Sequence, residues 1–180
     1  CKNKKIITNL EISLNDEILS VALKNKPNFV CIVPEKRKEV TTEGGLNLSK
    51  NIKKIKKIIS KFKKKNIRTS LFIDPNLKDI KFAKELNADC VELHTGKISN
   101  LIKNNKNHSY EYKKIMKCCV LANNIGLEVH AGHGLDYKTT AILSKLKEIQ
   151  EFNIGHFIIG ESLVHGLKNT IKKFKKISNK

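Results

Sequence analysis

Short apolar segments alternate with longer amphipathic segments along the whole chain. The apolar segments are rich in β-branched residues and predict strands over residues 5–12, 28–33, 68–73, 89–94, 127–131 and 153–159. After each one, apolar residues recur at helical spacing, which predicts helices over residues 16–25, 49–65, 76–86, 110–124, 138–148 and 162–176. The pattern therefore predicts six consecutive strand–helix units.

Consecutive strand–helix units imply parallel strands joined by right-handed crossovers. A doubly wound open sheet and a (β/α)₈ barrel both have this pattern. No glycine-rich dinucleotide fingerprint follows any of the predicted strands, which weakens the first alternative. A full barrel needs about 250 residues, whereas this chain has 180. We therefore expect one α/β domain over residues 1–180, of the TIM barrel class, with about six βα units and the first two missing.

The net charge of +19 comes almost entirely from lysine, because Arg37 and Arg68 are the arginines among 36 basic residues. Proteins that read nucleic acids depend on arginine for bidentate contacts, so this charge fits lysines on solvated helix faces better than a specific nucleic-acid partner. No apolar run is long enough to span a membrane, and no signal peptide is recognisable. Five cysteines without a CxxC pair indicate a reducing, cytoplasmic setting.

The carboxyl ends of barrel strands converge on one pocket, so the polar residues there are candidates for chemistry. Glu11 and Glu92 lie within apolar strands, where burial should raise their pKa towards the range useful for proton transfer, unless a lysine pairs with them. His133 lies between Gly132 and Gly134, which predicts an accessible imidazole that acts as an acid or a base. These residues predict acid–base catalysis.

Glycines near the last two strands suggest what the substrate carries. Gly134, Gly155 and the turn around Gly160 could present backbone N–H groups to a phosphate. Phosphate sites at this position are common in barrels, so we expect a phosphorylated small molecule as substrate.

Histidines at strand ends also raise the possibility of a metal site. His94 closes a predicted strand, His133 follows one and His156 lies in the sixth, but no pair of them has a compact ligand motif. We therefore expect no metal.

A long polar loop follows the second predicted strand, with the sequence IVPEKRKEVTTEGG over residues 32–45. It is one of several motifs that together resemble the pyridoxine 5'-phosphate synthases, the ring-closing enzymes of vitamin B6 biosynthesis. The matching segments run in order along the chain: NLE at 9–11, VPEKRKEVTTEGGL at 33–46, SLFID at 70–74, ELHTG at 92–96, AGHGL at 131–135, NIGH at 153–156 and IIG at 158–160.

This resemblance implies a (β/α)₈ barrel that assembles as a homo-octamer and uses no metal or organic cofactor. It implies condensation of 3-amino-2-oxopropyl phosphate with 1-deoxy-D-xylulose 5-phosphate. Three matched positions imply catalytic roles: a general base at Glu11, a transition-state stabiliser at Glu92 and a proton donor at His133. Four others imply substrate contacts: Thr41 to the deoxyxylulose phosphate, and Gly134, Gly155 and His156 to the amino-ketone phosphate.

Part of the family pattern has no counterpart in these 180 residues. The first two strands of the family carry another catalytic histidine and residues that grip phosphates, so we expect this chain alone to be weakly active or inactive. The alternative is a truncated, inactive or structural subunit of the same family. Two further alternatives are a polycation that binds RNA loosely and a phosphosugar aldolase or isomerase. The last would need a Schiff-base lysine in a strand, and no predicted strand presents an obvious one.

Overall fold

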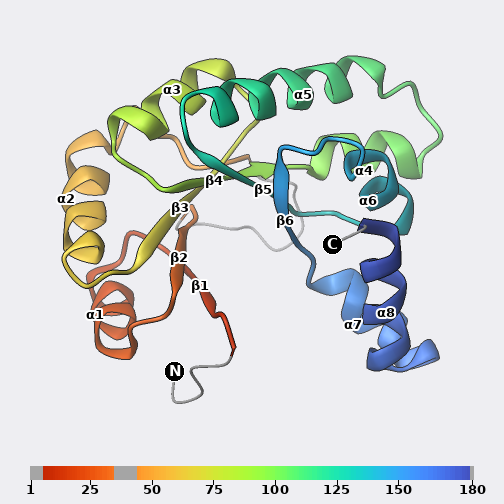
Figure 1. Cartoon of the computed structure of the whole chain (residues 1–180), viewed down its shortest axis with the longest axis horizontal. Coiled ribbons are helices and arrows are strands. Elements are labelled where there is room, and N and C mark those ends of the chain that lie inside the picture. Colours follow the sequence, from red (N-terminus) through yellow and green to blue (C-terminus); the bar gives the residue numbers. More distant parts are fainter. Residues whose placement is uncertain (1–5, 35–43, 179–180) are drawn as a thin grey trace.

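A computed structural model of the chain describes residues 6–34 and 44–178. Its centre is one parallel sheet in which the six strands follow the order of the sequence, and Figure 1 shows this sheet curved into part of a barrel. The strands are β1 (Asn9–Ile12), β2 (Phe29–Ile32), β3 (Arg68–Ile73), β4 (Cys90–His94), β5 (Glu128–Gly132) and β6 (Ile149–Asn153). The predicted α/β architecture of about six barrel-type units is confirmed.

Helices follow the strands, and most of them lie on the outer face of the curved sheet (Figure 1). They are α1 (Asp16–Asn25), α2 (Ile52–Lys63), α3 (Leu77–Glu85), α4 (Gly96–Lys103), α5 (Ser109–Asn124), α6 (Tyr137–Leu143), α7 (His156–His165) and α8 (Leu167–Ser178). Side-chain caps fix several starts, because the side chains of Asn15, Asn76 and Asp136 each accept a hydrogen bond from a backbone N–H in the first turn.

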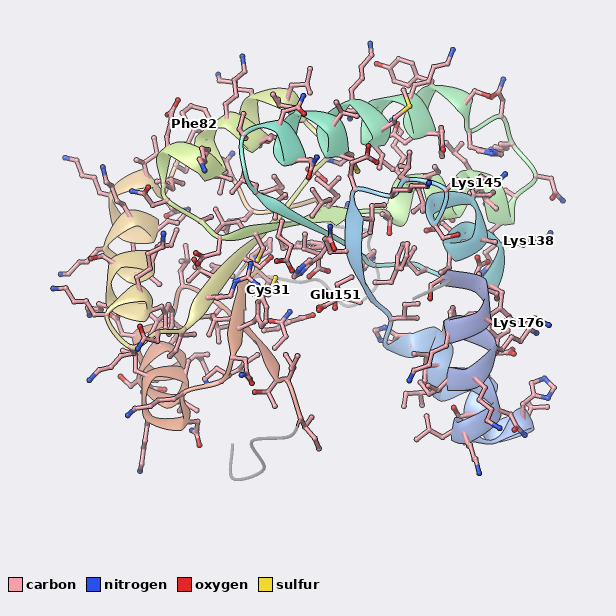
Figure 2. The ribbon with its side chains drawn as sticks, viewed as in Figure 1. Cys31, Phe82, Lys138, Lys145, Glu151 and Lys176 are labelled. Carbon is pink, nitrogen blue, oxygen red and sulfur yellow. The ribbon has the colours of Figure 1, made fainter. Side chains whose placement is uncertain are left out.

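Side chains along each strand point alternately to an outer apolar face and to an inner polar face of the sheet. On β4, Val91 and Leu93 belong to the main core under the helices, whereas Cys90, Glu92 and His94 alternate with them. Figure 2 shows Cys31 and Glu151 on the inner side of the sheet, and Lys138 on the outside. The apolar face stabilises the fold, and the inner face is left for polar groups.

The sheet remains open between its first and last strands. In the described part of the chain, β1 pairs with β2 and β6 pairs with β5, and the two edge strands do not pair with each other. The amide of Asn9 donates a long hydrogen bond of 3.5 Å to Glu151 across this gap. The first and last strands are therefore linked by this side-chain contact and not by a strand ladder.

The last third of the chain departs from the prediction. The strand expected over residues 153–159 is β6 at Ile149–Asn153, and the apolar run after it forms α7. Ile149 is fully buried and pairs with Val129 of β5. The strand therefore starts at residue 149 and not at residue 153. The helix expected over residues 162–176 is interrupted at Gly166, whose φ of 76° ends α7 before α8 begins.

Two helices also differ from expectation. Helix α4 follows β4 directly, where only an irregular segment was expected, and α6 ends at Leu143 instead of residue 148. None of the described helices is long and apolar enough to cross a membrane.

Candidate active site

A cavity of about 1190 Å³ opens at the carboxyl ends of the strands. Six of the seven residues predicted from the sequence line it, from four different strand ends: Glu11, Glu92, His133, Gly134, Gly155 and His156. The seventh, Thr41, lies outside the described residues. The fold therefore brings together side chains that are up to 145 positions apart in the sequence, Glu11 and His156 being the outermost.

Glu92 is the buried carboxylate of this cavity, with 4% of its surface exposed. Its Oε2 accepts a hydrogen bond of 2.8 Å from the amide of Asn153 and one of 3.4 Å from the thiol of Cys31. Burial raises the pKa of Glu92, these two hydrogen bonds oppose the rise, and the nearby charge of Glu11 adds to it. The expectation of a raised pKa is confirmed for this residue.

Gly132 makes room for the Glu92 carboxylate. It pairs with His94 across β4 and β5, and a side chain at this position would overlap Oε1 of Glu92. A glycine is therefore required where β5 passes the carboxylate.

Glu11 is exposed, so the expectation that it is buried is wrong. The reason is that β1 is an edge strand, with a neighbour on one side only. Glu11 and Cys31 are register partners on β1 and β2. The pKa of Cys31 is raised mainly by burial, then by Glu92, and to a smaller extent by the charge of Glu11. Glu11 is a carboxylate that a substrate can reach from solvent, beside a carboxylate that is enclosed.

His133 is exposed on the cavity wall, as its position between two glycines predicted. Its backbone has a φ of 76°, in the left-handed region that non-glycine residues rarely adopt. Thr95, which follows β4 and is fully buried, donates its backbone N–H to the carbonyl of Gly132 at 2.8 Å. The Thr95 hydroxyl lies 2.8 Å from that carbonyl and 2.7 Å from the carbonyl of His133. These contacts hold the unusual turn in place.

The amino end of α7 forms another part of the cavity wall. Gly155 precedes the helix, His156 is its first residue, and both are exposed. A Cβ on Gly155 would meet no atom within 4 Å, so the space beside this helix start is open. A helix start favours anions because its first N–H groups lack partners within the helix. Glu161 also lines the cavity and brings a negative charge close to this end.

Three residues lie close enough to be considered as metal ligands, but at the opposite end of the barrel interior. Possible ligand atoms of Cys90, Glu128 and His130 lie within 4.8 Å of one another. The guanidinium of Arg68 donates to Glu128 at 2.6 Å and to the sulfur of Cys90 at 3.4 Å. A cationic group thus already occupies this cluster.

Three further residues, to which the sequence assigned no catalytic or substrate-binding role, support the predicted ones directly or through one another. Asn153 donates to Glu92, and the ring of His94 packs beside that of His133 with centroids 4.7 Å apart. Asp74 lies 3.2 Å from His94, joining its Oδ1 to Nδ1 of the ring. The sequence marks Asp74 and His94 as strand-end residues, and only the sheet register shows which residues they contact.

Comparison with known proteins places almost the whole chain in one family. Residues 2–180 match the family described as pyridoxal phosphate biosynthesis protein PdxJ. A pyridoxine 5'-phosphate synthase of Pelagibacter ubique is 78% identical over all 180 residues, which cover 75% of that protein. The synthase of Zymomonas mobilis is 45% identical over 93% of this chain and 64% of its own length. The synthase of Bdellovibrio bacteriovorus is 40% identical over 98% of this chain and 72% of its own length.

The matched segment includes every described residue of the cavity, and the shared region is a six-unit part of a barrel. The chain belongs to the PdxJ family of pyridoxal phosphate biosynthesis proteins.

Proposed function

We propose that the chain acts as a pyridoxine 5'-phosphate synthase. The reaction condenses 3-amino-2-oxopropyl phosphate with 1-deoxy-D-xylulose 5-phosphate to form pyridoxine 5'-phosphate, with release of phosphate and water. The observation that carries the proposal is a single cavity in which a buried carboxylate, an exposed carboxylate and an exposed imidazole face the same space. The names of the relatives support the same activity.

Ring closure between an amine and two carbonyl-bearing substrates needs repeated proton transfer and loss of water. In the proposed mechanism, Glu11 acts as the general base because it is exposed to the substrate. Glu92, whose pKa is raised by burial, stabilises the transition state by sharing a proton or a hydrogen bond. His133 donates a proton to the leaving oxygen from the open cavity wall.

The same proposal assigns the substrate contacts. Gly134, Gly155 and His156 bind the phosphate of the amino-ketone, which is supported by the open space at the start of α7. Thr41 binds the deoxyxylulose phosphate, by family resemblance alone. Two substrates held in one cavity react faster because binding has already removed their translational freedom.

The direct test is phosphate release by the purified chain with both substrates, with each substrate omitted in turn as a control. The proposal expects release that requires both substrates and falls by about 100-fold or more in His133→Asn, since loss of a general acid typically costs this much. Identification of pyridoxine 5'-phosphate by mass spectrometry completes the test. Release that is unchanged in His133→Asn would contradict the role of that residue.

The alternative is a family member that binds substrates without turning them over. It is favoured by the open sheet, because β1 and β6 do not pair in the described part of the chain. Calorimetric titration with each substrate separates the two: binding without phosphate release supports the alternative, and the absence of both would contradict family function for this chain.

Self-association is a further part of the proposal, as is a cytoplasmic location. Helix α7 and the first residue of α8 expose four large apolar side chains: Ile159, Leu163, Val164 and Leu167. Such a surface favours contact with another apolar surface. Sedimentation velocity of the wild-type chain and of Leu163→Glu tests this. We expect a lower oligomeric state for the variant. If both proteins sediment as monomers, the proposal of self-association is contradicted.

A further inference from the structure

Asp74, which is half-exposed, and His94, which is buried, form a pair beside the candidate active site, on the far side of His133. Asp74 directly follows β3, and His94 is the last residue of β4. Oδ1 of Asp74 lies 3.2 Å from Nδ1 of His94, whose exposed fraction is 6%. The hydrogen bond from His94 holds the pKa of Asp74 below its usual range despite burial, and a backbone hydrogen bond from Gly45 adds to this. Asp74 is thus a carboxylate that stays charged behind the His94 ring.

The Asp74 carboxylate also orients the imidazole of His94. A carboxylate accepts hydrogen bonds only, so the ring places its proton on Nδ1 and leaves a lone pair on Nε2. Nε2 is buried, and no described residue forms a hydrogen bond with it. A buried acceptor without a partner costs stability, so its presence here calls for a functional explanation.

The ring of His94 packs against the ring of His133. The two ring centroids are 4.7 Å apart with an interplanar angle of 48°. Gly96 lies beside both rings, and a Cβ built on it would be 2.9 Å from Nε2 of His94 and 2.9 Å from Cδ2 of His133. Phe72 packs edge-on against His94 at 5.3 Å and fixes it from another side. The contact between the imidazoles is close, and any side chain larger than hydrogen at residue 96 would disturb it.

We propose that Asp74 and His94 are positioning residues that orient the His133 imidazole and favour its protonated form. The negative charge of Asp74 lies behind the His94 ring, and that ring packs against His133, so the pair stabilises a positive charge on the His133 imidazole. A proton donor must hold its proton until the reaction needs it, so the pair prepares His133 for the role given under the proposed function, on which this inference rests.

The position of the pair separates it from substrate binding. Asp74 and His94 line a neighbouring cavity of about 380 Å³ with Lys97 and Lys106, and they are not among the residues that line the larger cavity. Loss of the pair is therefore expected to lower kcat and to leave KM largely unchanged.

Other charged groups also face His133 and must be held constant in a test. Glu11 from β1, Glu92 from β4, and His156 and Glu161 from α7 line the same cavity. Lys97 lies beside the pair, and the charge of Lys114 on α5 contributes to lowering the pKa of Asp74. None of these groups is altered when Asp74 alone is replaced.

The test is an NMR titration of the His133 ring in the whole chain, comparing the wild type with Asp74→Asn. Asparagine keeps an oxygen that accepts the His94 proton but removes the charge. We expect the midpoint of the His133 titration to move to lower pH by about half a pH unit, the size expected for one charge at this separation in a half-exposed site. Glu85→Gln, which removes an exposed carboxylate at the end of α3, is the matched control and should not move it.

The kinetic arm uses the same variants. The acidic group seen in the pH profile of kcat should move in the same direction as the NMR midpoint, with kcat reduced and KM retained. A His133 midpoint that is the same in Asp74→Asn and wild type would overturn the inference, whether or not the chain turns over substrate. If the midpoint moves but no phosphate is released by the wild type, the pairing stands and the proposed function fails.

Discussion

Two inward-facing glutamates on neighbouring strands show how the same residue type takes different roles. Glu92 on β4 lies near the carboxyl ends, and Glu128 on β5 lies at the amino ends of the strands. Glu128 is bonded to the guanidinium of Arg68 at 2.6 Å and to the ring of His130 at 2.9 Å. The partners of Glu92 are a neutral amide and a thiol. One carboxylate is paired with a cation, and the other is not.

The pKa values of the two residues differ accordingly. Burial alone would raise the pKa of Glu128, but the hydrogen bonds from His130 and Arg68 hold it below its usual value. Burial dominates at Glu92 and raises its pKa. A glutamate held in its charged form by a cation is suited to stabilising the fold, whereas the raised pKa of Glu92 fits the catalytic role proposed for it.

The largest effect is expected for Glu92→Gln, which keeps the shape and removes the carboxylate. Phosphate release should fall by about 100-fold or more, because the amide cannot exchange a proton with the substrate. Stability should not fall at pH 8. The raised pKa of Glu92 means that the folded state prefers the protonated form, so the wild type loses stability as pH rises above the ordinary glutamate pKa of about 4.3. The variant lacks this loss.

Urea unfolding of the wild type and of Glu92→Gln at pH 5 and pH 8 measures the second part. The stability difference between the two proteins should favour the variant more at pH 8 than at pH 5. A variant that is destabilised at pH 8 would mean that Glu92 contributes to the fold as Glu128 does.

A smaller effect is expected for Thr95→Val, which removes the hydroxyl beside the carbonyls of Gly132 and His133. The left-handed turn at His133 should relax, and kcat should fall about tenfold, since a buried hydrogen bond contributes on the order of 1 kcal/mol. Thr95→Ser retains the hydroxyl and is the matched control. Equal losses of kcat in the two variants would show that the hydroxyl does not hold His133.

Much of this architecture was predictable from the sequence, because each of the first five strands is a short apolar run that a helix follows. The sixth was misplaced because residues 157–159 form an apolar run more strand-like than β6 itself, whose Glu151 and Asn153 face inward. Alternation with polar residues, typical of a sheet with a functional inner face, was the missed signal.

The site was predictable in part for the same reason. Glu92 and His133 stand out locally, as a carboxylate in an apolar strand and a histidine between glycines. The partners do not, since Asn153 is 61 residues from Glu92 and Asp74 is 20 residues from His94. Those contacts depend on the register of β3 to β6, which no local pattern specifies. The exposure of Glu11 likewise depends on β1 being an edge strand.

At the amino ends, Arg68→Met tests whether the paired glutamate stabilises the fold. The free energy of unfolding should fall by about 1 kcal/mol at pH 7, because the ion pair is partly exposed and screened by water. Phosphate release should be unchanged. Because the pKa of Glu128 is lowered in the folded state, the pair stabilises above the ordinary glutamate pKa of about 4.3, and the difference from wild type should vanish as pH falls through the lowered value.

Lys63→Met is the matched control for this comparison. Lys63 pairs with Asp89 at 3.7 Å, and its side chain has the same exposed fraction, 44%, as that of Arg68. The longer contact should contribute less, at most about 0.5 kcal/mol. An Arg68→Met variant as stable as Lys63→Met would show that the inner cluster contributes no more than an ordinary surface pair.

The smallest effect is expected at Cys90, which lies in the same cluster as Glu128. Burial raises the pKa of this thiol to about 12, although Arg68 opposes the rise. At pH 8 about one molecule in ten thousand then carries the reactive thiolate. Native protein treated with iodoacetamide should show almost no alkylation of Cys90 by peptide mapping, whereas protein in guanidinium should be fully alkylated. Rapid alkylation in the native state would mean that the amino ends open readily, and the contrast between a closed, paired end and an open, catalytic end of the same sheet would no longer hold.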